Sequence, residues 1–119
     1  SDQNQKQDIA VLTAAELATA KALKGLIKTF RWKDAVAKKG DKARTHVGVI
    51  AQEVQAAFIA NGLDADKYGL FCSDTWYEVD GKKSEDLANP YTAETPNAVA
   101  VTQLGVRYEE LLAFVIAAI

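Results

Sequence analysis

The chain has 119 residues, a formal net charge of −2, one Cys, one His and no Met. Its length fits a single domain, residues 1–119, with one modest hydrophobic core. Apolar residues make up 49% and charged residues 25%, which is typical of a globular protein and argues against disorder. The near-neutral charge argues against a general nucleic-acid or membrane-surface binder, and no apolar run reaches the roughly 18 residues of a membrane helix.

The single Cys and the single His exclude two common kinds of site. Cys72 alone cannot form an internal disulfide, and Cys72 with His46 is too small a set for a zinc site. We therefore predict no metal and no cofactor. The absence of Met, with Ser1 at the start, indicates a processed or excised piece or a cloning remnant.

The first half of the chain predicts two helices and two strands. After a polar head, residues 1–8, Thr13 and Glu16 form a capping-box pattern for an Ala-rich helix that ends at Gly25. The following segments are expected to be a strand, a basic loop, a second strand and a second helix: Thr29–Lys33, Lys33–Arg44, His46–Ala51 and Gln52–Asn61.

The second half predicts two more strands, Tyr68–Val79 and Ala98–Tyr108, separated by a long polar loop, Asp80–Asn97. A loop of this length in a small domain is usually functional or disordered. A last helix opens at Glu109 and is apolar on every side, so it must be buried. It either lies at the centre of the single-chain core or is covered by self-association.

One pair of residues in the polar head has chemical potential. Ser1 and Lys6 lie five positions apart. A serine nucleophile needs a base, and a lysine supplies one when burial favours its neutral amine. The spacing alone occurs by chance in most proteins, so it carries weight only with further support.

Three blocks of the sequence supply that support, because they resemble the C-terminal intramolecular chaperone domain of endosialidase type, found on phage tailspikes and tail fibres. The first block is the head, with Ser1, Asp2, Lys6 and Ile9 in the family's spacing, although Asn4 replaces a frequent arginine. The second runs from Thr29 to Lys33 and continues at His46–Val54, where Gly48–Val54 is the most specific signature. The third is Val106–Phe114.

The resemblance implies an α+β fold, with a small antiparallel sheet, flanking helices and terminal helices that pack in a homotrimer. It implies that the domain assembles an upstream β-structured fibre shaft of the same polypeptide in the cytoplasm of the infected bacterial host. The domain would then cut the peptide bond before Ser1, with Ser1 as nucleophile and Lys6 as general base, and leave the mature fibre. Loop 80–97 is a candidate arm toward the shaft.

Two other interpretations remain open from the sequence. The chain can be a non-cleaving oligomerisation or adhesion module at a fibre tip, which would look the same outside the head. It can also be a cytosolic regulatory domain unrelated to phage, which predicts a monomer or dimer.

Overall fold

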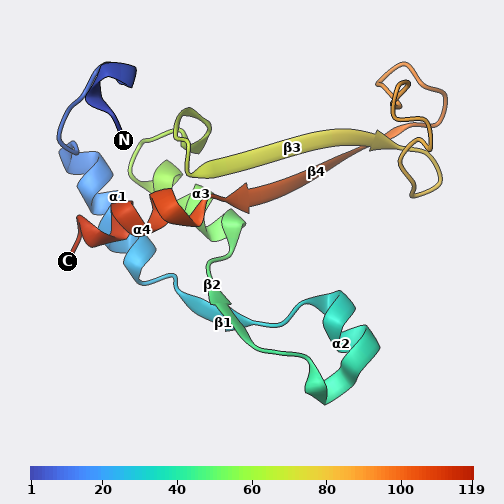
Figure 1. The fold of residues 1–119 in the computed structure, drawn as a ribbon, viewed down its shortest axis with the longest axis horizontal. Coiled ribbons are helices and arrows are strands. Elements are labelled where there is room, and N and C mark those ends of the chain that lie inside the picture. The colour runs from blue at the N-terminus through green and yellow to red at the C-terminus, as the bar shows by residue number, and fades with distance from the viewer.

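A computed structural model describes residues 1–119 (Figure 1). Four α-helices and four strands follow one another along the chain, with short 3-10 turns at Gln3–Gln5, Gly40–Lys42 and Ala65–Lys67. The order is α1 Ala14–Lys24, β1 Lys28–Phe30, α2 Lys33–Lys39, β2 His46–Gly48, α3 Ala51–Ala60, β3 Phe71–Glu78, β4 Val99–Val106 and α4 Tyr108–Ile116. No helix is both long and apolar enough to cross a membrane.

Helix α1 begins and ends where the sequence predicts. The Thr13 hydroxyl accepts a hydrogen bond from the Glu16 amide at 3.1 Å, and the Glu16 carboxylate accepts one from the Thr13 amide at 2.8 Å. This confirms the capping box, and Gly25 caps the other end. The buried side of the helix consists of Thr19, Ala20 and Leu23, and small residues on that side let α1 lie close to its neighbours.

The strands form two separate antiparallel ribbons of two strands each. In the short ribbon, β1 pairs with β2 over three residues, with Thr29 opposite Val47. In the long ribbon, β3 pairs with β4 over eight residues, from Phe71 opposite Val106 to Glu78 opposite Val99. The α+β class with small antiparallel pairing is therefore confirmed, and the sheet is divided in two.

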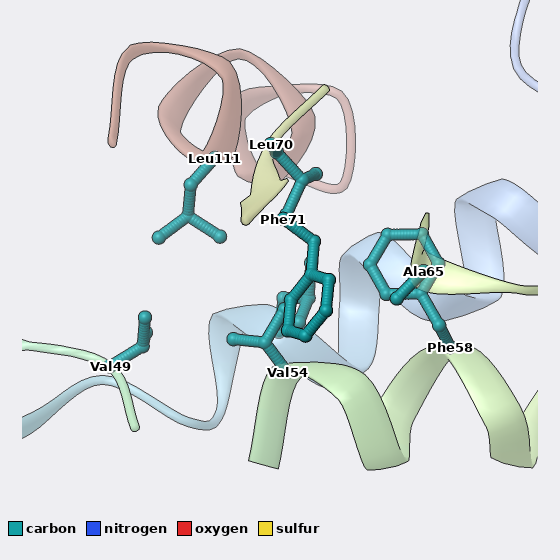
Figure 2. Close-up of a cluster of buried hydrophobic side chains, with 8 residues drawn as sticks. Val49, Val54, Phe58, Ala65, Leu70, Phe71 and Leu111 are labelled. Atoms are coloured by element: carbon teal, nitrogen blue, oxygen red, sulfur yellow. The ribbon is translucent and has the colours of Figure 1, made fainter. Parts of the chain in front are cut away.

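The hydrophobic core lies where α1, α3, α4 and the base of β3 meet (Figure 2). Phe58 from α3 is fully buried and packs against the Tyr68 and Phe114 rings, at centroid distances of 4.9 and 5.9 Å. The eight buried residues of the cluster are Leu23, Val49, Val54, Phe58, Ala65, Leu70, Phe71 and Leu111. Burial of these side chains is the main source of the stability of the single chain.

The prediction of a loop at Lys33–Arg44 is wrong, because the segment folds as α2 followed by a 3-10 turn. Its lysines and alanines are good helix formers, and Asp34 near the start and Lys38 near the end suit the helix dipole. Gly40 ends the helix with a φ of 58°. The first two strands are shorter than predicted, because Trp32 is the N-cap of α2 and Ile50 is the N-cap of α3.

The single chain is far more extended than a compact domain of its length. Its radius of gyration is 18.2 Å, whereas about 13–14 Å is expected for this length. Its accessible surface is 9088 Å², whereas about 6,300 Å² is expected for its mass of 12.9 kDa. Both ribbons project away from the body where α1, α3 and α4 gather (Figure 1). Surface of about 2,800 Å² thus remains available for contacts with other chains.

The last helix is only partly buried within this chain. Leu111 is 1% exposed and packs in the core, but Leu112 is 56% exposed and Ile116 is 67% exposed. The single-chain core therefore covers one side of α4 and leaves the opposite apolar side open.

Candidate active site and its surroundings

The head that carries Ser1 and Lys6 folds into one 3-10 turn, Gln3–Gln5. The Asp2 side chain caps this turn by accepting a hydrogen bond from the Asn4 amide at 2.9 Å, and the Lys6 amide donates to the Gln3 carbonyl at 3.1 Å. Asp2, which the sequence singled out with Ser1, is thus the residue that shapes the turn. The turn keeps Ser1 and Lys6 on one short, locally ordered segment.

The pair of residues predicted to be catalytic is not assembled in the single chain. Ser1 and Lys6 are both exposed, and no hydrogen bond joins the Ser1 hydroxyl to the Lys6 amine. An ammonium group surrounded by water keeps its proton, so a lysine base needs a covering surface that excludes water. No such surface covers Lys6 in the single chain.

The chain bends where the head ends, and a polar contact holds the start of the helix that follows. Asp8 has a φ of 55°, in the left-handed region that Asp tolerates better than most residues. Beyond the extended segment that follows, the Glu16 carboxylate accepts a hydrogen bond from the Tyr68 hydroxyl at 2.7 Å. The Thr13 amide and the Tyr68 hydroxyl together hold the pKa of Glu16 below its usual value, and the same carboxylate raises the pKa of Tyr68. Glu16 therefore anchors the start of α1 to the segment before β3.

A second long-range contact joins two of the three blocks that carry the family resemblance. The Tyr108 hydroxyl accepts a hydrogen bond from the Val49 amide at 3.2 Å and lies against the buried Gly48. A Cβ at Gly48 would overlap the Tyr108 hydroxyl, so a larger residue here would displace the tyrosine. Gly48 and Tyr108 both belong to blocks that carry the resemblance, but nothing in the sequence indicates that these two residues are in contact.

The unexpected helix α2 adds a surface that the sequence did not predict. Phe30, Trp32 and His46 form an aromatic cluster, with Phe30 and His46 stacked at 5.7 Å and Phe30 edge-on to Trp32 at 5.0 Å. This cluster borders an open groove of about 1320 Å³ between the short ribbon with α2 and strand β4. His46 therefore packs against the Phe30 and Trp32 rings at the edge of this groove.

Cys72 and Glu53 have structural roles. Cys72 is half-buried in β3, opposite Gly105 of β4. Glu53 of α3 accepts a hydrogen bond from Lys28 at 2.6 Å and forms an ion pair with it. Neither residue joins Ser1 and Lys6.

The long loop between β3 and β4 has local order of its own. Asp86 accepts hydrogen bonds from the Ala88 amide at 3.0 Å and the Asn89 side chain at 2.8 Å, and these bonds lower the pKa of Asp86. At the base of the loop, the Lys83 amine lies 4.3 Å from the centre of the Trp76 ring, in a cation–π contact. The long ribbon therefore ends in a folded tip, far from the helical body (Figure 1).

Comparisons with known proteins agree with this architecture. One solved structure, described as the crystal structure of a novel intramolecular chaperone, is similar with a TM-score of 0.72 and 31% identity, over 99% of this chain and 93% of that chain. A second is the carboxy-terminal domain of the bacteriophage T5 L-shaped tail fibre with its intramolecular chaperone domain. It aligns with a TM-score of 0.69 and 25% identity, over 99% of this chain and 28% of that one.

Similarity in sequence also points to phage tail proteins. The probable tail spike protein of Klebsiella phage 0507-KN2-1 is 39% identical over 129 aligned residues, which cover 98% of this chain and 10% of that protein. The chain thus spans about a tenth of the length of this relative. Residues 1–63 match the model of a peptidase family described as chaperone of endosialidase. These matches argue against a regulatory domain unrelated to phage, and the chain belongs to the chaperone of endosialidase family.

Proposed function

We propose that this chain is an intramolecular chaperone that trimerises, promotes assembly of an upstream phage tail fibre or tailspike shaft, and then releases itself by cutting the bond before Ser1. Family membership supports the chaperone role and a self-cleaving peptidase in general. The observation that carries the proposal is the head, where Ser1 and Lys6 flank one capped turn within the matched residues 1–63.

The extent of the single chain supports self-association. A chain that exposes about 2,800 Å² more than a compact domain of its mass has the surface for more than one standard interface, each of which takes about 800 Å² per partner. Apolar side chains on that surface include Leu112, Ile116 and Trp32. Three chains held together at one end raise each other's local concentration and align strands whose pairing is otherwise slow and prone to slip.

In the proposed cleavage, the Ser1 hydroxyl oxygen attacks the carbonyl carbon of the residue before it, and the neutral Lys6 amine takes the hydroxyl proton. The bond between that carbonyl carbon and the Ser1 nitrogen breaks as the Lys6 ammonium returns a proton to the nitrogen. The product is an ester on the Ser1 oxygen. Water then hydrolyses the ester, which leaves a carboxylate on the shaft and restores the Ser1 hydroxyl.

Exposure of both residues in the single chain links the cut to assembly. A lone chain leaves Lys6 in water, where a lysine does not act as a base, whereas a neighbouring chain or shaft can cover it. Cleavage would therefore follow assembly in the cytoplasm of the infected host, and the domain would leave the mature fibre. We propose that the ordered tip of the long ribbon, within 80–97, is the segment that reaches toward the shaft.

Mutation of the pair tests the proposal. The chain is expressed with the upstream residues that its gene encodes, as wild type, Ser1→Ala, Lys6→Arg and the control Lys21→Arg, which lies on α1. On denaturing gels, we expect the wild type and Lys21→Arg to be cut before Ser1. Ser1→Ala and Lys6→Arg should stay full length, because alanine has no hydroxyl and a guanidinium keeps its proton.

Two results would decide against parts of the proposal. A wild type that stays full length while forming trimers by light scattering would leave a non-cleaving oligomerisation module. Normal cleavage of Lys6→Arg would show that Lys6 is not the base.

A further inference from the structure

Residues 28–48, which comprise β1, α2 and β2, form a projecting unit that we term the basic arm. Two strands of three residues each and one seven-residue helix make up most of it, and it extends away from the helical body (Figure 1). A two-stranded hairpin is at best marginally stable in water by itself. Trp32 is 59% exposed and Val47 is 69% exposed, so the arm presents apolar surface that nothing in this chain covers.

Charge is divided unevenly between the basic arm and the rest of the chain. The arm carries seven Lys and Arg residues against two Asp residues, whereas the remaining 98 residues carry seven against 14 Asp and Glu residues. The groove beside the arm is lined by Lys33, Lys38 and Lys39 together with apolar residues that include Phe30 and Val47. A partner suited to this groove combines aliphatic side chains with negative charge.

Helix α4 of the same chain has that combination on its open side. Glu109, Leu112 and Ile116 follow one another at spacings of three and four residues, which places them on one face of the helix. Leu112 and Ile116 are the exposed apolar residues of that face. The opposite face, with Leu111, packs in the core, and neither Leu112 nor Ile116 lines the groove of its own chain.

We propose that the α4 face formed by Glu109, Leu112 and Ile116 docks into the basic-arm groove of a neighbouring copy. The proposal rests on the trimerisation proposed above and specifies its contact. An amphipathic helix laid in an apolar groove is a common recognition mode, in which apolar anchors enter the groove and charges pair at the rim. Because the groove and the helix are different surfaces, each copy gives one and receives the other. Such a head-to-tail contact closes into a ring of three when successive copies are related by a rotation of one third of a turn. The contact covers both the open side of α4 and the exposed Trp32.

Disulfide trapping tests this contact in the complete chain. In a Cys72→Ala background, Val47→Cys with Leu112→Cys places one thiol in the groove and one on the docking face. We expect oxidation to give covalent dimers and trimers on a non-reducing gel, while each single variant stays a monomer. The control pair is Ile59→Cys with Leu112→Cys, because Ile59 is 64% exposed on α3 and does not line the groove. This control should give little cross-linked product.

Light scattering on the same samples distinguishes the proposed docking of α4 from the proposed trimerisation. Absence of cross-linking in a sample of trimeric mass would overturn the docking and leave trimerisation intact, and a monomeric mass would overturn both. Efficient cross-linking of Leu112→Cys alone would also overturn the docking, since it would mean that α4 helices pack on one another around the axis.

A charge exchange provides a second measurement that needs no added cysteine. We expect Lys38→Glu with Lys39→Glu to raise the chain concentration needed for trimers several-fold, and added Glu109→Lys to restore much of the loss. Failure of Glu109→Lys to restore any of that loss would contradict the proposed pairing.

Discussion

Replacement of Gly48 by alanine tests how the C-terminal helix is held against the base of the short ribbon. Gly48 is buried in β2, and a Cβ added there would overlap the Tyr108 hydroxyl and lie 3.2 Å from a ring carbon of Phe30. Tyr108 is the first residue of α4, and its hydroxyl accepts a hydrogen bond from the Val49 amide. An added methyl group at Gly48 would displace the tyrosine and disturb this hydrogen bond.

The expected cost follows from these contacts. Overpacking by one methyl group in a tight site typically costs about 1–3 kcal/mol of unfolding free energy. Tyr108→Phe removes the hydrogen bond to Val49 and should cost about 0.5–1.5 kcal/mol. In the double variant the hydroxyl that clashes is already gone, so we expect the combined loss to be smaller than the sum by about 1 kcal/mol.

Urea denaturation of the four proteins measures this coupling. All samples need one chain concentration, because association makes apparent stability depend on it. Gly25→Ala is the matched control, since Gly25 has a negative φ of −82° and the nearest atom to an added Cβ is the Ala22 carbonyl oxygen at 3.5 Å. Strictly additive losses, or a Gly48→Ala variant as stable as Gly25→Ala, would refute the proposed close contact.

Three further substitutions probe other contacts. Hydrogen bonds hold the pKa of Glu16 low, so the folded state binds this proton less readily than the unfolded state does. The resulting stability is present above the ordinary value of about 4.5 and is lost as the pH falls through the lowered value. Glu16→Gln should flatten this acid limb in urea titrations run from about pH 3 to about pH 6, roughly 1.5 pH units to either side of 4.5. Leu111→Ala should cost about 2–5 kcal/mol, measured by urea denaturation, because the side chain is 1% exposed in the core. Gly40→Ala should lower the thermal midpoint slightly, because Gly40 has a φ of 58°, with Gly25→Ala again as control.

Local signals in the sequence predicted the parts of the fold that depend on local chemistry. The capping box of Thr13 and Glu16 set the start of α1 because both hydrogen bonds lie within four residues. Helix α3 and the paired strands β3 and β4 also follow from their apolar patterns and lie within the predicted ranges, to within a residue at the start of α3. Helix α2 was missed because its lysines were interpreted as a charged turn, although lysine and alanine also favour helices.

Long-range contacts could not be predicted in the same way. Tyr68 reaches Glu16 across 52 residues, and Tyr108 reaches the Val49 amide across 59. Each depends on how α1, α3 and α4 pack, which no spacing within one segment specifies. The head is the reverse case, since Ser1 and Lys6 lie close in sequence, but both are exposed and no contact within the chain brings their side chains together.

The small core and the large exposed surface together explain why folding, assembly and self-cleavage would belong to one domain. With 12 of 119 residues buried, a single chain gains little from burial to offset the entropy lost by ordering two projecting ribbons. Association that covers those ribbons would supply the missing burial, and under our proposal the same event would exclude water from Lys6. A cut made at that stage would remove the domain only after the shaft has formed. The shaft would then be kinetically stable, because a shaft that unfolded could not refold without the domain that aligned its chains.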